Sequence, residues 1–155
     1  MIFLRSRSGL TVSSISLAVS IAHSAQAEKL SPEWQEQREY YNVLSEEACA
    51  GDRASYETLH DMAMSEWNPA AMNGLAWVYL TEECPYYHED TDVAVGLQLE
   101  SSKAGYPIAT NNMAHRYMLG DGVKQNSQTA LKYFERAISM GYGTSAIDLA
   151  HYYLD

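Results

Sequence analysis

Residues 112–123 read NMAHRYMLGDGV, and the start of this stretch recurs as LAWVYL at residues 75–80 and as LAHYYL at residues 149–154. A small residue occupies the same place in every copy: Ala76, Ala114 and Ala150. These alanines are 38 and 36 residues apart. A period in this range is typical of stacked helical repeats. The sequence therefore predicts a repeated structural unit rather than a catalytic motif.

Residues that start and stop helices divide the chain after residue 27 into seven segments. Prolines suited to a first turn, and Asp or Asn residues suited to an N-cap, mark the starts: Pro32, Asp52, Pro69, Asp90, Pro107 and Asn126. Glycines mark several of the ends: Gly51, Gly105, Gly120 and Gly141. No useful length alternates with the period of a strand. An all-α fold with about seven helices and no sheet is expected.

The central unit resembles a Sel1-like repeat, a relative of the tetratricopeptide repeat. The residues that carry the resemblance are Ala109, Met113, Ala114, Tyr117, Gly120, Gly122, Val123, Ala130, Tyr133, Phe134, Ala137 and Gly141. The resemblance implies a right-handed α-solenoid of antiparallel helix pairs. It implies repeats at 69–105 and 106–141 and a partial repeat at 142–155. The expected N-terminal helix pair at 28–67 is compatible with the resemblance but is not covered by it.

Two parts of the array depart from this pattern. Repeat 69–105 has a longer loop at residues 82–89, and Gln98 and Ser101 stand where an aromatic residue and an alanine are usual, so looser packing is expected. The partial repeat lacks a second helix. Either it forms a polar cap, with Ala146, Leu149, Ala150 and Tyr153 packed inward and Asp148 and His151 in water, or it is a docking surface. The cap is favoured, because repeat arrays usually need one.

The first 27 residues have the layout of a secretory signal. Arg5 and Arg7 precede a mostly apolar run at 10–22, and Ala25 and Ala27 are small residues suited to cleavage. The sequence predicts a cut after Ala27 and a periplasmic or secreted protein, with no membrane insertion after cleavage. An uncleaved anchor is the alternative, although the run is shorter than the roughly 20 residues of a span.

Acidic residues are concentrated in the first half of the chain. The net charge is −10, and residues 28–92 contain 15 Asp or Glu against 3 Lys or Arg, whereas residues 93–155 contain 5 of each. Nucleic acids and anionic lipids require clustered basic residues, so neither is expected as a ligand. A basic protein or peptide partner fits this charge, and so does a solvated acidic surface without a partner.

Cys49 and Cys84 are the two cysteines of the chain. Antiparallel succession of the expected helices places the end of the first helix and the loop after the third at the same edge of the array. Because exported proteins commonly form disulfides and the two cysteines are expected at one edge, a disulfide between them is predicted. Two unpaired thiols remain the alternative.

The sequence lacks the common signatures of catalysis and of cofactor binding. It has no Gly-x-Ser-x-Gly elbow, His-Glu-x-x-His helix, phosphate-binding glycine loop or Cys-x-x-Cys. No enzyme activity, cofactor or metal site is therefore expected. A hydrolase using His115 or His151 is a weaker alternative, because no nucleophile accompanies either histidine in the sequence.

The repeat leaves one position free to differ, and Trp77, His115 and His151 occupy it in successive copies. By resemblance to tetratricopeptide arrays, this position lines a concave groove, with Asn73 and Asn111 a turn earlier. An aromatic anchor with amides suits an extended peptide backbone. These five residues are the predicted partner-binding set, and ordinary exposed helix positions are the alternative.

The acidic loop after the third expected helix is a second candidate contact. Tyr86 and Tyr87 offer apolar area to a basic protein. Calcium binding through Glu89, Asp90 and Asp92 is less favoured, because the loop lacks the order of an EF-hand. The expected function is a non-catalytic adaptor or regulator. The alternative is an immunity-type inhibitor of a secreted toxic enzyme.

Overall fold

The computed structural model describes residues 29–84 and 90–154, and these form seven α-helices and no strand. The helices are α2 (Pro32–Cys49), α3 (Arg53–Met64), α4 (Pro69–Leu80), α5 (Thr91–Lys103), α6 (Pro107–Leu119), α7 (Ser127–Ser139) and α8 (Thr144–Leu154). The all-α prediction is confirmed. The N-terminal segment 1–28 lies outside the described residues.

Caps and prolines explain where the helices begin. The side chain of Asn68 accepts a hydrogen bond from the backbone N–H of Ala71, and Pro69 fills the first turn of α4. The side chain of Asp52 caps α3 in the same way, by accepting from the N–H groups of Ala54 and Ser55. Such bonds satisfy N–H groups that have no partner inside the helix. The sequence therefore determines the helix starts locally.

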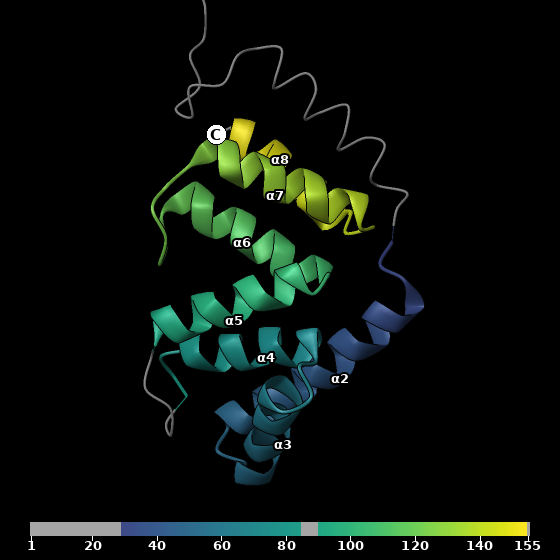
Figure 1. Ribbon diagram of the computed structural model, residues 1–155, viewed down its shortest axis with the longest axis vertical. Coiled ribbons are helices and arrows are strands. Elements are labelled where there is room, and N and C mark those ends of the chain that lie inside the picture. Colours follow the sequence, from purple (N-terminus) through teal and green to yellow (C-terminus); the bar gives the residue numbers. More distant parts are fainter. Residues whose placement is uncertain (1–28, 85–89, 155) are drawn as a thin grey trace, which may run out of the picture.

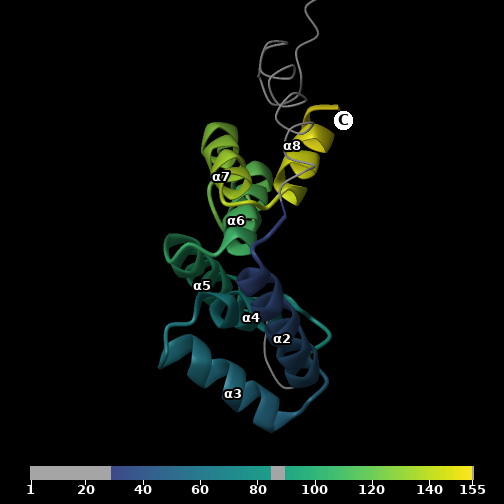
Figure 2. The ribbon, with the colours of Figure 1, turned by 90° about the vertical axis from the view of Figure 1, so that its right-hand side faces the viewer.

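Consecutive helices pack against one another and build an elongated array. Figure 1 shows α3 at one end, α7 and α8 at the other, and α4, α5 and α6 stacked between them. The first helix, α2, packs against both α3 and α4 (Figure 2). The N-terminal part of α2 also reaches the residue that precedes α6, because the ring of Trp34 meets the buried ring of Tyr106 in a T-shaped contact, with 5.3 Å between centroids.

Small buried residues let the helices approach closely, as the repeat pattern predicts. Ala114 of α6 and Ala130 of α7 are fully buried, and between the same two helices the rings of Tyr117 and Tyr133 stack with centroids 5.5 Å apart. The core has two clusters. One lies among α2, α3 and α4 and reaches the start of α6, and the other lies among α6, α7 and α8.

The Gly-Asp-Gly turn after α6 packs directly on α5. Gly120 ends α6 with a left-handed φ of 78°, and a Cβ added at Gly122 would lie 2.6 Å from Cγ2 of Val95. The buried Arg116 side chain joins the same parts: Nε donates to Oε1 of Gln98 at 2.6 Å, and Nη1 donates to the Asp121 carboxylate at 2.9 Å. Burial lowers the pKa of Arg116, and the charge of Asp121 opposes that effect.

The looser packing expected at Gln98 and Ser101 is not observed. Their exposed fractions are 4% and 0%. Gln98 accepts a hydrogen bond from Arg116, and the hydroxyl of Ser101 donates to the Pro69 carbonyl at 2.5 Å. Polar residues pack tightly here because each has a partner on a neighbouring helix.

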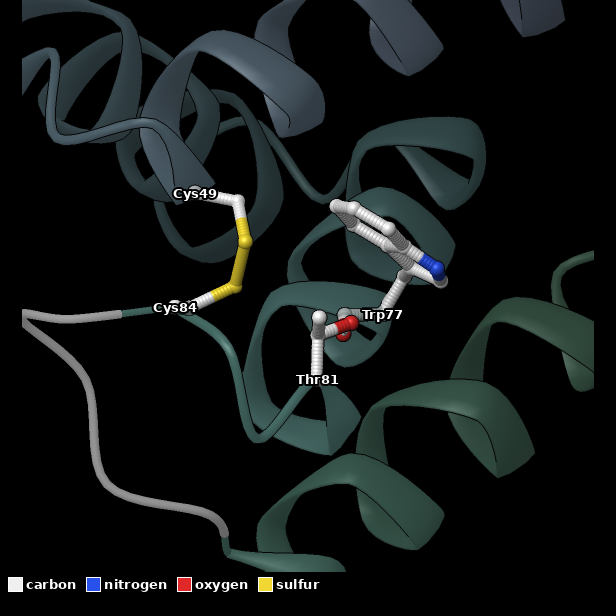
Figure 3. Close-up of a disulfide and its surroundings, with 4 residues drawn as sticks. All are labelled: Cys49, Trp77, Thr81 and Cys84. Carbon is white, nitrogen blue, oxygen red and sulfur yellow. Dashed lines mark hydrogen bonds between the residues drawn. A yellow bond between two sulfur atoms is a disulfide. The ribbon is translucent and has the colours of Figure 1, made fainter.

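Cys49 and Cys84 form a disulfide, as predicted, with their Cα atoms 4.5 Å apart. It joins the C-terminal end of α2 to the segment that follows α4. Figure 3 shows the bond together with Trp77 and Thr81, which belong to the same end of α4. The sulfur of Cys84 belongs to the core of the first cluster, since this residue is only 3% exposed.

The helix α8 packs on α7 and is linked to α6 by side-chain hydrogen bonds. Ala146 and Leu149 are fully buried, and His151 is exposed, as the cap hypothesis predicts. Asp148 differs from that prediction, because its side chain is partly buried rather than exposed to water. Its carboxylate is 24% exposed and bonds to side chains of α6.

Candidate partner-binding site

The repeated variable position lies on three successive first helices of the helix pairs. Trp77 is on α4, His115 on α6 and His151 on α8. Trp77 is 41% exposed, the side chain of His115 is 42% exposed, and His151 is exposed. All three predicted residues therefore have a surface that a partner can reach.

The amides one turn earlier link these helices to one another. Nδ2 of Asn112 donates to Oδ1 of Asn73 at 2.9 Å, and Nδ2 of Asn111 donates to Oδ2 of Asp148 at the same distance. Asn73 and Asn111 occupy equivalent positions in successive repeats. In each bond the partner lies one residue after the equivalent position of the following repeat, because the repeats are 38 and 36 residues apart. The two bonds are therefore equivalent rungs between α4 and α6 and between α6 and α8.

Asn111 is a correction to the predicted binding set. It is only 5% exposed, and its Oδ1 accepts a hydrogen bond from the Ser145 hydroxyl at 2.6 Å while its Nδ2 donates to Asp148. Because its amide is buried between α6 and α8 and already makes these hydrogen bonds, Asn111 is not available to bind a partner. Its role is to attach the terminal helix.

Two predicted residues, Asn73 and Trp77, line a hollow of about 230 Å³, which we term the polar hollow. Its full lining is Asn42, Ser45, Glu46, Asn73, Gly74, Trp77, Gln98 and Asn112. The hollow is therefore built by α2, α4, α5 and α6. His115 and His151 do not line it, so the predicted partner-binding residues do not share one hollow.

Sequence reasoning missed the α2 wall of this hollow. Asn42 and Glu46 are exposed and lie seven and three residues before Cys49, so all three share one face of α2. The predicted disulfide turns that face toward α4, and this was a usable signal. Asn112, one residue from the predicted Asn111, was missed because only the packing shows which of the two faces outward.

A close approach between α2 and α4 forms the floor of the polar hollow. A Cβ added at Gly74 would lie 2.6 Å from Oγ of Ser45 and 3.4 Å from the carbonyl oxygen of Tyr41. A side chain at this position would have to displace the Ser45 hydroxyl or move α2. The disulfide closes one end of the same contact, and Thr81 Oγ1 donates to the Trp77 carbonyl at 2.8 Å near that end (Figure 3). The hollow therefore lies between helices that are held in place.

His115 and Asp148 form the main electrostatic pair of the C-terminal part. Nε2 of His115 lies 2.9 Å from Oδ2 of Asp148, so Nε2 carries the proton that is donated to the carboxylate. Burial raises the pKa of Asp148, but hydrogen bonds from His115 and Asn111, with the charges of His115 and His151, outweigh burial and lower it.

An acid that orients a histidine is also part of many hydrolytic sites. The rings of His115 and Phe134 also form a T-shaped contact, with centroids 5.1 Å apart. Among the described residues, no serine, threonine or cysteine bonds to this histidine. The pair joins α8 to α6 through the hydrogen bond between His115 and Asp148.

Asp148→Asn should lower the free energy of unfolding by about 1 kcal/mol at pH 7, because a charged acceptor is lost. The pKa of Asp148 is lower in the folded chain than in the unfolded chain, so its contribution is complete above the unfolded value of about 3.9. It is lost as the pH falls through the folded value. The difference between wild type and variant should therefore shrink below about pH 4, as measured by urea unfolding at several pH values.

Glu135→Gln on the exposed surface of α7 is the matched control for this pH dependence. It removes one carboxylate without touching the contact between α6 and α8. If the two variants show the same pH dependence, a general charge effect explains the result and the assignment to the His115–Asp148 pair is wrong.

The remaining predicted contacts belong to the segment between α4 and α5 and to the start of α5. Tyr86, Tyr87 and Glu89 lie outside the described residues. Asp90 serves as the N-cap of α5 and accepts a hydrogen bond from the backbone of Val93. Within residues 29–84 and 90–154, no three His, Cys, Asp or Glu side chains gather closely enough to hold a metal ion. No helix in those ranges is long and apolar enough to cross a membrane.

Comparisons with known proteins agree with this architecture. The family model of the Sel1 repeat matches residues 107–142, which nearly coincide with the predicted central repeat. A crystal structure of a Sel1 repeat protein from Oxalobacter formigenes is similar in fold, with a TM-score of 0.58 and 22% identity over 89% of this chain and 98% of that one. No curated protein matches the chain. The chain thus contains a Sel1 repeat at residues 107–142 and has the fold of a Sel1-like α-solenoid.

Proposed function

We propose that this chain is an exported, non-catalytic protein-binding module that holds an extended segment of a partner in the polar hollow. Sel1 repeats generally mediate contacts between proteins. The observation that carries the proposal is the lining of the hollow, which contains four side-chain amides and one exposed tryptophan. Amides both donate and accept, so they complement the N–H and C=O groups of an extended backbone.

The hollow has free capacity for such bonds. The hydrogen bond between Asn73 and Asn112 uses one of the several that each amide can make. Asn42 adds an exposed amide from the opposite wall. Because α2 and α4 are tied by a disulfide, the partner meets a preformed surface, and little ordering of this chain opposes binding.

The charge of the hollow indicates which side chain the partner presents. Glu46 is the one charged residue among those that line it, and the indole of Trp77 lies in the same lining. A Lys or Arg of the partner can pair with the carboxylate and lie over the indole. We therefore assign the hollow to a segment that contains a basic residue.

Export is part of the proposal and has one structural support. Disulfides persist in oxidising compartments such as the periplasm, and the only two cysteines of the chain are paired. The layout of residues 1–27 suggests the route. A fusion of these residues to alkaline phosphatase, which is active only after export, tests it directly.

Trp77→Ala should weaken binding of hollow-directed peptides by at least about tenfold, because an aromatic anchor at the centre of a site carries much of the affinity. Peptides are selected from a phage-displayed random library against residues 28–155. Their dissociation constants are then measured by fluorescence anisotropy. The selected peptides should contain a Lys or Arg, and Glu46→Gln should weaken them too while leaving the shape of the hollow unchanged.

Leu119→Ser is the matched control, because Leu119 is 70% exposed at the end of α6 and does not line the hollow. This variant should bind the selected peptides as wild type does. Thermal unfolding of every variant shows whether its fold is intact. Selected peptides that bind folded Trp77→Ala and Glu46→Gln as tightly as wild type would overturn the assignment of this hollow.

The acidic first half supports a second candidate function, inhibition of a basic secreted enzyme in the manner of an immunity protein. The supporting observation is the excess of 15 acidic over 3 basic residues within residues 28–92. This function predicts tight one-to-one binding that weakens steeply with salt. An extended peptide bound through amides should depend much less on salt, so the salt dependence of the native complex distinguishes the two functions.

A further inference from the structure

Trp67, in the link between α3 and α4, has a backbone conformation that a tryptophan rarely adopts. Its φ is 56°, and within the described residues it is the one non-glycine with a positive φ. This left-handed conformation is unfavourable for a bulky residue and suits glycine or asparagine. The residue is also 67% exposed. Neither the backbone nor the core therefore accounts for a tryptophan here.

The indole forms one wall of an apolar hollow of about 120 Å³, which we term the Trp67 hollow. Its lining is Ala63, Met64, Trp67, Met72, Gly96, Leu97 and Glu100. These residues come from α3, the start of α4 and α5. Met64 is 50% exposed, so a second large apolar side chain is left open beside the indole. The hollow is separate from the polar hollow and shares no lining residue with it.

Gly96 keeps the Trp67 hollow open. It lies in the middle of α5, where glycine weakens a helix, and an added Cβ would meet nothing within 4 Å. No close approach of another helix requires a glycine at this position. A side chain would therefore fit at this position in the lining of the Trp67 hollow. Both Trp67 and Gly96 therefore lower the stability of the fold at their positions, and both line an open apolar surface.

One carboxylate, Glu100, belongs to the lining of the hollow, and two more lie near it along the helices. Asp92, Gly96 and Glu100 follow one another at four-residue spacing along α5, so the two acids lie one turn to either side of the glycine. Glu100 also forms an ion pair with Lys103 at 2.7 Å. Both side chains are about half exposed, so this pair is weak and a cationic side chain of a partner can replace Lys103. Asp61 lies one turn before Met64 on α3. The surface is therefore apolar at its centre and acidic at its rim.

We propose that the Trp67 hollow is a second docking surface, which binds the apolar face of a basic amphipathic helix of a partner protein. One apolar side chain enters between Trp67 and Gly96, and Lys or Arg residues one turn to either side reach Asp92 and Glu100. The charge at the rim selects a basic partner, and the four-residue spacing along α5 matches the spacing of residues on one face of a helix. This inference does not depend on the peptide assigned to the polar hollow.

The test uses two synthetic 18-residue helical peptides with the same leucine face, one with lysine and one with glutamate on the polar face. Binding to residues 28–155 is measured by fluorescence anisotropy. Wild type should bind the lysine peptide at least about tenfold more tightly than the glutamate peptide. Trp67→Gly and Gly96→Leu should each weaken the lysine peptide by at least about tenfold, because one removes a wall and the other fills the hollow.

Stability separates this role from a structural one. Gly96→Leu replaces a helix-interior glycine, and Trp67→Gly relieves a left-handed residue, so each variant should keep or raise the melting temperature, by about 3 °C. Leu119→Ser is the matched control for exposed apolar area and should leave affinity unchanged. A loss of affinity without a loss of stability is not expected of residues that only support the fold.

Three outcomes would overturn the proposal. The first is no preference of wild type for the lysine peptide. The second is equal affinity of wild type, Trp67→Gly and Gly96→Leu, which would mean that the lysines bind the acidic surface in general. The third is a wild-type dimer in sedimentation that both variants convert to a monomer, which would make a second copy of this chain the occupant.

Discussion

Replacing both cysteines, as Cys49→Ser with Cys84→Ser, should lower the free energy of unfolding by about 4 kcal/mol. The bond closes a loop with a sequence separation of 35 residues, and without it the unfolded chain gains the conformational freedom of that loop. For a domain of this size the loss is a large part of the whole stability. Urea unfolding of the variant and of oxidised wild type measures the difference.

Reduced wild type is the control for the double variant, because it has the same loop freedom without any change of sequence. The two should have the same stability. If the double variant is within about 1 kcal/mol of oxidised wild type, residual structure already holds the unfolded loop together, and the chain-entropy account is wrong. A second readout is peptide binding, which should weaken because α2 and α4 are no longer tied at one end of the polar hollow.

Helix boundaries were predictable from this sequence because their causes are local. Pro69 and Pro107 occupy first turns, and Asn126 and Asp52 accept hydrogen bonds from N–H groups within the next three residues. Each signal operates within one turn of the chain, so no knowledge of the neighbouring helices was needed. The disulfide followed from the same information, since the order of helices determines at which edge each of them ends.

The candidate site was less predictable because it depends on rotation and register between helices. Asn111 and Asn112 are neighbours in the sequence, but a step of one residue turns a side chain by about 100° around the axis. One amide is therefore buried against α8 while the other lines the polar hollow. Trp67 carried no local signal either, because a positive φ is normally indicated by glycine or asparagine.

Gly122→Ala should cost about 3 kcal/mol of unfolding free energy, from a strained backbone and from a clash. The φ of Gly122 is 65°, a left-handed value that an alanine adopts only with strain. An added Cβ would lie 2.6 Å from Cγ2 of Val95 and 2.8 Å from Cγ2 of Thr91, so the turn would have to lift from α5. Arg116 would then be pulled from Gln98, because the same turn holds its partner Asp121.

Gly105→Ala separates the two causes. Gly105 also has a positive φ, at 96°, but a Cβ added there meets nothing within 4 Å. This control should therefore cost only the backbone strain, about 1 kcal/mol. Equal costs for the two variants, measured by urea unfolding under the same conditions, would show that Val95 and Thr91 give way freely. A larger cost at Gly122 would establish that the second glycine of the Gly-Asp-Gly turn sets the distance between α5 and α6, and with it the position of the Gln98 wall of the polar hollow.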